Sequence, residues 1–163
     1  MSWLKGALVI ILLSWGVREA LAGQATTTFN VTATVTGSCS LATTNLNFGG
    51  VNVFSSTPID ATSSITVTCV SGVAYNLGLD AGTSSGATVT SRKMTSGSNT
   101  LNYSLFTDSA RTTNWDNIGG SNVVSGTGNG SGQAVTVYGR IPTGQTAVPP
   151  GSYSDTINVT VSF

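Results

Sequence analysis

Residues 28–39 read TFNVTATVTGSC, and this stretch decides the fold. Its apolar residues occupy alternate positions: Phe29, Val31, Ala33 and Val35. Asn or Thr fills the positions between them, and a period of two is the pattern of a strand with one apolar face. Gly37 ends the run and Cys39 follows at once. We expect this apolar face to fill a slot in the next copy of the protein rather than in its own domain.

The first 22 residues have the pattern of a secretory signal. Lys5 supplies a positive charge, and residues 7–15 (ALVIILLSW) form an apolar run that is too short to span a membrane. Residues 20–22 (ALA) form a small-x-small cleavage site. We therefore predict a signal peptide over residues 1–22 and a mature chain from Gly23. The alternative is an uncleaved membrane anchor, which the short apolar run disfavours.

Few charges remain after the predicted signal. The basic residues are Arg92, Lys93, Arg111 and Arg140. They form no basic stripe, so a nucleic-acid partner is not expected. Low charge also favours association over free solution, which fits a protein that ends in a solid assembly.

The sequence contains two cysteines, Cys39 and Cys69. An even number of cysteines in an exported chain indicates a disulfide. The bridge would close a loop of about thirty residues, which the chain-entropy model values at roughly 3–4 kcal/mol. The alternative is two buried free thiols, which the export signal disfavours.

The rest of the chain is predicted to be all-β. Short alternating runs recur at residues 46–48, 64–70, 75–79, 101–106, 133–141 and 152–163. Gly, Asn, Ser and Pro separate these runs, and no stretch after residue 22 has a helical period. This pattern is typical of one β-sandwich domain.

The last run carries its apolar residues on one face: Tyr153, Ile157, Val159, Val161 and Phe163. Asp155 is the only break in that face. No sequence follows to cover this run, so we expect one strand position of the sandwich to be unfilled. A detachable apolar strand and an open edge together predict head-to-tail addition of a strand, and such a contact produces a filament.

Eight segments together carry a family resemblance: the alternating run before Cys39, NLNFGGV (45–51), ITVTC (65–69), YNLGLDAG (75–82), TSRKM (90–94), LNYSLFTDSARTTNW (101–115), VYGRIP (137–142) and PGSYSDTINVTV (150–161). Their number and order resemble the spore coat protein U (SCPU) domain family. Within it, they resemble the major subunits of archaic (Csu-type) chaperone–usher pili.

The resemblance implies an incomplete immunoglobulin-like sandwich over residues 37–163 that lacks its final strand, with residues 23–36 as a donor-strand segment. The donor residues would be Phe29, Val31, Ala33 and Val35. The acceptor groove would be lined partly by Ile157, Val159, Val161 and Phe163.

The resemblance also implies a route and partners. A periplasmic chaperone would lend a strand during export, and an outer-membrane usher would exchange it for the segment of an incoming subunit. The product would be a homopolymer on the cell surface, used for adhesion and biofilm formation, with minor and tip pilus subunits as further partners. A rod subunit is the expected role, because a tip adhesin would carry an additional domain in front.

Three other functions compete with that of a pilus subunit. An enzyme is disfavoured because the chain has no histidine, its cysteines are expected to be paired and its Asp residues are isolated. No catalytic residue, metal site or cofactor is therefore predicted. A carbohydrate-binding module could use Trp115 and Tyr103 for stacking, although packing is the favoured role of both. A secreted spore-coat or matrix protein of the same fold is the third. Arg92 and Lys93 could form a contact between turns of a coiled rod, but a solvated edge is the favoured position of this pair.

Overall fold

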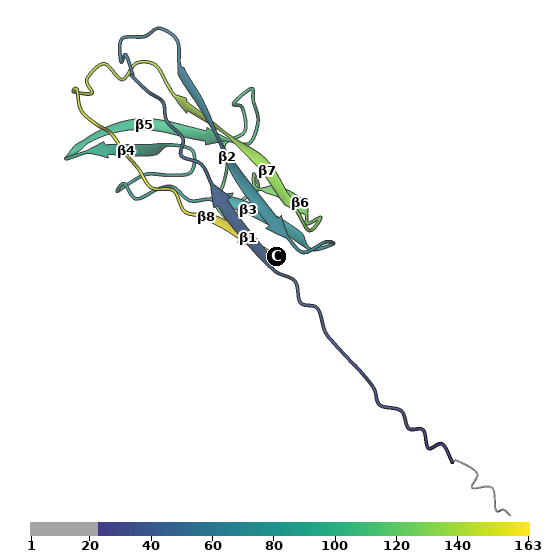
Figure 1. Cartoon of the computed structure of the whole chain (residues 1–163). Coiled ribbons are helices and arrows are strands. Elements are labelled where there is room, and N and C mark those ends of the chain that lie inside the picture. The colour runs from purple at the N-terminus through teal and green to yellow at the C-terminus, as the bar shows by residue number, and fades with distance from the viewer. Residues whose placement is uncertain (1–22) are drawn as a thin grey trace, which may run out of the picture. The chain divides into compact units, whose positions relative to one another are not determined.

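The structure is a computed structural model that describes residues 23–163 (Figure 1). The predicted signal over residues 1–22 lies outside the described residues. Residues 35–163 form one unit, which holds every described strand. Residues 23–38 adopt no strand or helix.

The unit contains two antiparallel sheets (Figure 1). The strands are β1 (Cys39–Thr43), β2 (Ile59–Cys69), β3 (Ala74–Leu79), β4 (Arg92–Ser96), β5 (Asn99–Phe106), β6 (Val124–Thr127), β7 (Gly132–Ile141) and β8 (Val159–Ser162). The larger sheet has the order β1-β2-β7-β5-β4, and the smaller sheet has the order β6-β3-β8.

The core lies between the two sheets and is built from the alternating runs of the sequence. Ile65 and Val67 of β2 are buried, as are Leu77 and Leu79 of β3. Trp115, from the loop after β5, is also fully buried, and its indole Nε1 donates a hydrogen bond to the carbonyl oxygen of Leu77 at 2.9 Å. The indole therefore secures the β5–β6 connection to the smaller sheet.

The predicted disulfide is confirmed. Cys39 lies directly opposite Cys69 in the β1–β2 pair, with the two Cα atoms 4.1 Å apart and the sulfur atoms bonded. The bridge thus fixes the beginning of β1 against the end of β2. Residues 28–36 end three positions before this anchor.

The fold is an incomplete immunoglobulin-like β-sandwich. In such sandwiches one sheet has four strands in the order A-B-E-D, and it faces a second sheet that contains strands C, F and G. The order β1-β2-β7-β5 reproduces the first sheet, and β3-β8 reproduces C and F. β8 pairs only with β3, and no strand within residues 23–163 occupies the position of G beside it.

Several expected elements differ from the structure. Residues 46–48 form no strand, and the last run pairs as a strand only over Val159–Ser162. β4 and β6 were not expected because their sequences, RKMTS and VSGT, lack apolar alternation. Residues 29–36, which are expected to pair only in a neighbouring copy, form no strand within the single chain. A strand requires neighbouring backbone groups to bond, and the sequence pattern alone does not supply them.

Candidate functional site: an open apolar groove

An open groove runs along the sandwich between residues 43–53, which follow β1, and residues 148–159, which lead into β8. Two adjoining hollows of about 540 Å³ and about 500 Å³ make up the groove. Its floor consists of buried core side chains: Ile65, Leu79, Tyr103, Leu105 and Val137. The groove therefore opens directly onto the hydrophobic core.

The first wall is formed by Leu46 and Phe48, both half-buried. The Phe48 ring meets the Tyr103 ring edge to face, with the ring centroids 6.2 Å apart. Both wall residues lie over Gly139 of β7, where a Cβ atom would come within 2.8 Å of Leu46 Cδ1 and 2.9 Å of Phe48 Cζ. Gly139 thus allows this wall to approach the sheet.

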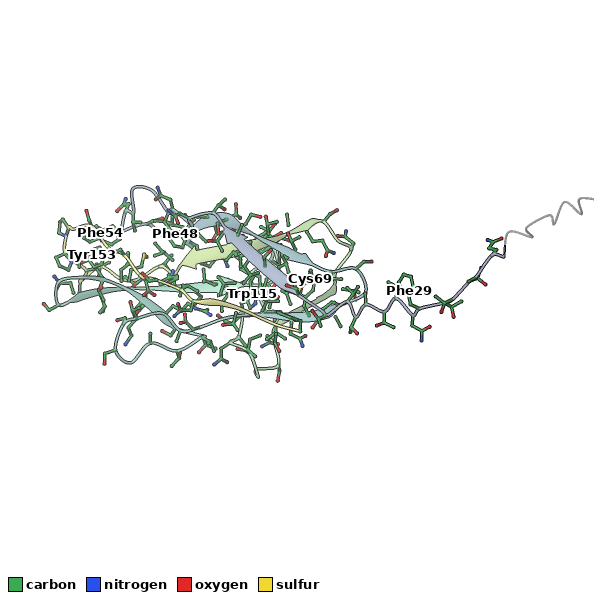
Figure 2. The ribbon with its side chains drawn as sticks, turned by 60° about the horizontal axis from the view of Figure 1, so that its bottom comes forward. Phe29, Phe48, Phe54, Cys69, Trp115 and Tyr153 are labelled. Carbon is green, nitrogen blue, oxygen red and sulfur yellow. A yellow bond between two sulfur atoms is a disulfide. The ribbon has the colours of Figure 1, made fainter. Side chains whose placement is uncertain are left out.

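The second wall is the segment before β8. Tyr153, Asp155, Ile157 and Val159 alternate inward along it, while the residues between them are exposed. Figure 2 shows Tyr153 and Phe48 toward the same end of the domain, with Cys69 farther along it. The backbone of Ser154 bonds Thr95 in both directions, at 2.8 and 3.1 Å. One edge of this segment is thereby tied to the sandwich, and the groove runs along the other side.

Open backbone edges border the groove. β8 pairs with β3 alone, and β1 pairs with β2 alone. Within the described part of the chain, the backbone groups of residues 45–48 have no hydrogen-bond partner. Unpaired edges of this kind are templates for an added strand.

The structure places the predicted groove residues in two environments. Ile157 and Val159 line the groove. Val161 is half-buried against the core beyond its end, and Phe163 is 61% exposed. Leu46 and Phe48 were not predicted as groove residues, although their alternation in NLNFGGV was the available signal.

The predicted donor residues are all exposed in the described chain. Phe29, Val31 and Val35 are 85%, 83% and 84% exposed, and Ala33 is exposed as well. Within residues 23–163, these large apolar side chains occupy odd-numbered positions of one short segment and form an exposed apolar face. Such faces mark interaction sites.

Asp155 is the only charged residue among those lining the groove. Its Oδ2 accepts a hydrogen bond from the Tyr103 hydroxyl at 2.6 Å. Its Oδ1 accepts from the backbone N–H of Thr83 at 2.9 Å, the Thr83 hydroxyl at 3.0 Å and the backbone N–H of Thr156 at 2.8 Å. Burial, together with the hydrogen bond to Asp155, raises the pKa of Tyr103 far above its ordinary value, so the phenol keeps its proton.

Arg92 is fully buried, so the expectation of a solvated edge is wrong for this residue. Its guanidinium donates to four backbone carbonyl oxygens, those of Asp80, Val89, Leu79 and Trp115. Burial lowers the pKa of Arg92 below its ordinary value. The side chain closes the end of the sandwich where β3, β4 and the Trp115 loop meet.

Asp155 is the only carboxylate that lines the groove. In residues 23–163 no three acidic or cysteine side chains gather into a group that could hold a metal ion. The same residues contain no helix with the length and hydropathy of a membrane span.

Comparisons with known proteins agree with the geometry. Residues 25–160 match the family model described as Spore Coat Protein U domain. Protein U of Myxococcus xanthus is 36% identical over 161 residues, covering 88% of this chain and 88% of that protein.

A solved structure is similar in fold. It is the crystal structure of the CsuC–CsuE chaperone–tip adhesion subunit pre-assembly complex from archaic chaperone-usher Csu pili of Acinetobacter baumannii, with a TM-score of 0.57 and 24% identity. The match covers 80% of this chain and spans 40% of that chain. On the family model and the similarity to Protein U, this chain belongs to the Spore Coat Protein U domain family.

Proposed function

We propose that the protein is a structural pilus subunit that polymerises by donor-strand exchange. Residues 28–36 of one copy fill the groove of the next copy and supply the strand missing beside β8. The single observation that carries the proposal is the pairing of two features in one chain: a groove open to the core and an exposed segment with one apolar face.

The dimensions of the two features agree. At about 3.3 Å per residue, a strand from Phe29 to Val35 spans about 20 Å. The inward wall from Tyr153 to Val159 contains the same number of residues, with side chains facing the groove at every second position. Four side chains of one copy can therefore be accommodated along four wall positions of another.

The chemistry of the two features also agrees. Burying a Val or Phe side chain is worth about 1.5–3 kcal/mol, which favours transfer of Phe29, Val31 and Val35 from water to the groove floor. The added strand would also pair with the open edge of the segment that leads into β8 and with residues 45–48. Each copy would then both donate a strand and accept one, and a head-to-tail filament follows.

An incomplete sandwich needs protection before assembly, since its open edge and core invite aggregation. We infer that a periplasmic chaperone covers the groove after export and that an outer-membrane usher exchanges this cover for the next subunit. The filament would be a surface pilus that serves adhesion and biofilm formation, with this chain as its rod subunit. The similar complex of a chaperone with a pilus subunit supports this route.

A second candidate is a secreted coat or matrix protein that assembles through the same groove. The 36% identity to Protein U of Myxococcus xanthus favours it. The sugar-stacking surface considered for Trp115 and Tyr103 is not present, because these side chains are 0% and 5% exposed. A chaperone gene and an usher gene beside the gene for this chain would favour a pilus subunit over a coat or matrix protein.

The test uses a variant that should fail to donate its own strand but should still accept a strand from another copy. Val31→Asp should abolish fibres, because it removes about 1.5 kcal/mol of burial and places a carboxylate in an apolar slot at a cost of several kcal/mol. The domain itself should be unaffected, so the variant should still accept a wild-type donor, and in a mixture with wild-type subunits it should block polymerisation at one end. The measurement is fibre yield, together with SDS-resistant multimers in unheated samples.

Asn30→Asp is the matched control, because Asn30 lies on the opposite face of the same segment. It adds the same charge one position away and should have a mild effect. Normal multimers from Val31→Asp, or equal damage from Asn30→Asp, would contradict the proposal.

A further inference from the structure

The geometry points to Asp155 as the residue that sets the direction and register of the incoming strand. We infer that residues 29–35 run antiparallel to residues 153–159, with Ala33 beside Asp155. This inference rests on the proposed function and adds to it the alignment of the two segments.

The wall segment (residues 153–159) and the donor segment (residues 29–35) each contain one residue that differs from the large apolar residues around it. The inward wall residues are Tyr153, Asp155, Ile157 and Val159, and only Asp155 is charged. The donor residues are Phe29, Val31, Ala33 and Val35, and only Ala33 has no side chain beyond Cβ. An alignment is favourable when the smallest donor residue meets the polar wall position.

Only one full-length alignment brings these two positions together. In the antiparallel direction Phe29 lies beside Val159, Val31 beside Ile157, Ala33 beside Asp155 and Val35 beside Tyr153. In the parallel direction Val31 lies beside Asp155, and Ala33 lies beside Ile157. The parallel alignment therefore places a branched apolar side chain against the carboxylate and leaves Ile157 facing the smallest donor residue.

The Asp155 carboxylate has its hydrogen-bond partners in place before an incoming strand covers it. Both carboxylate oxygens are hydrogen-bonded before any strand arrives, to Tyr103, to Thr83 and to the backbone of Thr156. Buried charges persist only when such bonds are made, so this group can lose its remaining water at a reduced cost. Gly82, with φ +85°, leaves room for it, because a Cβ atom there would overlap the carboxylate.

The saturated carboxylate is also held in place, so it cannot turn aside for a larger neighbour. Its partners come from the β3–β4 loop and from β5, two separate parts of the sandwich. A Val or Phe at the donor position beside Asp155 would press against the fixed carboxylate oxygens of Asp155. Alanine leaves these bonds undisturbed, so Asp155 selects the alignment by excluding larger residues.

Cysteine pairs in the full-length protein test the alignment. Directly opposed residues of antiparallel strands have Cα atoms about 4.5–5.5 Å apart, which suits a disulfide. Val31→Cys with Ile157→Cys should yield covalent multimers on boiled, non-reducing gels, at least about tenfold more than Ala33→Cys with Ile157→Cys. More cross-linking from the Ala33→Cys pair would overturn the alignment.

Two further variants test the role of Asp155 itself. Ala33→Val should lower the yield of SDS-resistant multimers about tenfold, which corresponds to about 1.4 kcal/mol, whereas Thr34→Val on the opposite face should not. Adding Asp155→Leu to the cysteine pairs should remove the preference for Val31→Cys. An unchanged preference, or equal yields from Ala33→Val and Thr34→Val, would exclude Asp155 as the determinant.

The controls distinguish this inference from the proposed function. If wild-type protein forms SDS-resistant multimers but neither cysteine pair cross-links, the alignment is wrong and donor-strand exchange stands. If wild-type protein forms no such multimers, donor-strand exchange fails and the alignment fails with it.

Discussion

Replacing Arg92 with methionine is expected to lower the free energy of unfolding by about 2–6 kcal/mol. The guanidinium lies wholly inside the domain and donates hydrogen bonds to four backbone carbonyl oxygens. Methionine has a similar length but no donor. The carbonyl groups would then lose their partner, and those of Leu79 and Trp115 lie in a region that water does not reach.

The magnitude follows from the two most buried contacts. Nη2 of Arg92 donates to the carbonyl oxygens of Leu79 at 3.0 Å and Trp115 at 2.8 Å. Each buried acceptor left without a partner costs about 1–3 kcal/mol, which gives the stated range for two. The bonds to Asp80 and Val89 are less buried, so water can replace part of their contribution.

Two companion variants make the prediction specific. Lys93→Met removes a neighbouring charge from a half-exposed side chain and should stay within about 0.5 kcal/mol of the parent. Arg92→Lys keeps the charge but not the planar fork of donors, so it should recover only part of the loss.

The assay is urea unfolding followed by tryptophan fluorescence, because Trp115 is the only tryptophan after residue 22. The parent would be a self-complemented fusion, in which residues 27–36 are moved from the front of the chain to a flexible linker behind Phe163. A loss below about 1 kcal/mol for Arg92→Met would show that the carbonyl groups find other partners, and the reasoning would fail.

Two other predictions follow from the contacts. Cys39→Ser should lower the unfolding free energy by roughly 3–4 kcal/mol and reduce subunit yield without changing fibre shape. Two free thiols in the exported wild-type protein, detected by mass measurement under non-reducing conditions, would contradict this prediction. The hydrogen bond from Arg140, aided by Arg111, lowers the pKa of Asp60 below its ordinary value of 3.8. The stability from this ion pair should therefore be complete above about pH 4 and be lost as the pH falls through the lower folded value. Arg140→Gln should move the Asp60 pKa, followed by NMR titration, back up toward the ordinary value, and an unchanged titration would refute the assignment.

The alternating segments made much of the architecture predictable from sequence. The runs around Ile65, Leu77 and Val137 identified core strands, because a half-buried strand places every second side chain in the core. The predicted signal peptide, together with the even number of cysteines, indicated the disulfide. Export and cysteine count are properties of the sequence as a whole, so they do not require knowledge of the pairing of strands.

The remaining features depend on pairing that local sequence does not encode. β4 and β6 are polar, and they exist as strands because β5 and β3 supply hydrogen-bond partners. Arg92 resembled a surface charge because its partners are backbone carbonyls, which carry no residue-specific signal. The inward face before β8 was predictable, but the opposite groove wall at Leu46 and Phe48 depends on the close approach that Gly139 allows.

The most direct test of donor-strand complementation is the thermal stability of the self-complemented fusion compared with the chain that starts after Thr36. The fusion is expected to be monomeric, because it has filled its own groove and has nothing to donate. Its unfolding midpoint should exceed that of the truncated chain by more than about 10 °C, since each kcal/mol shifts the midpoint of a domain of this size by several degrees. Val31→Asp within the moved segment should remove most of this gain, and Asn30→Asp should preserve it. Equal midpoints for the fusion and the truncated chain would show that the sandwich is already complete, and that outcome would contradict the account.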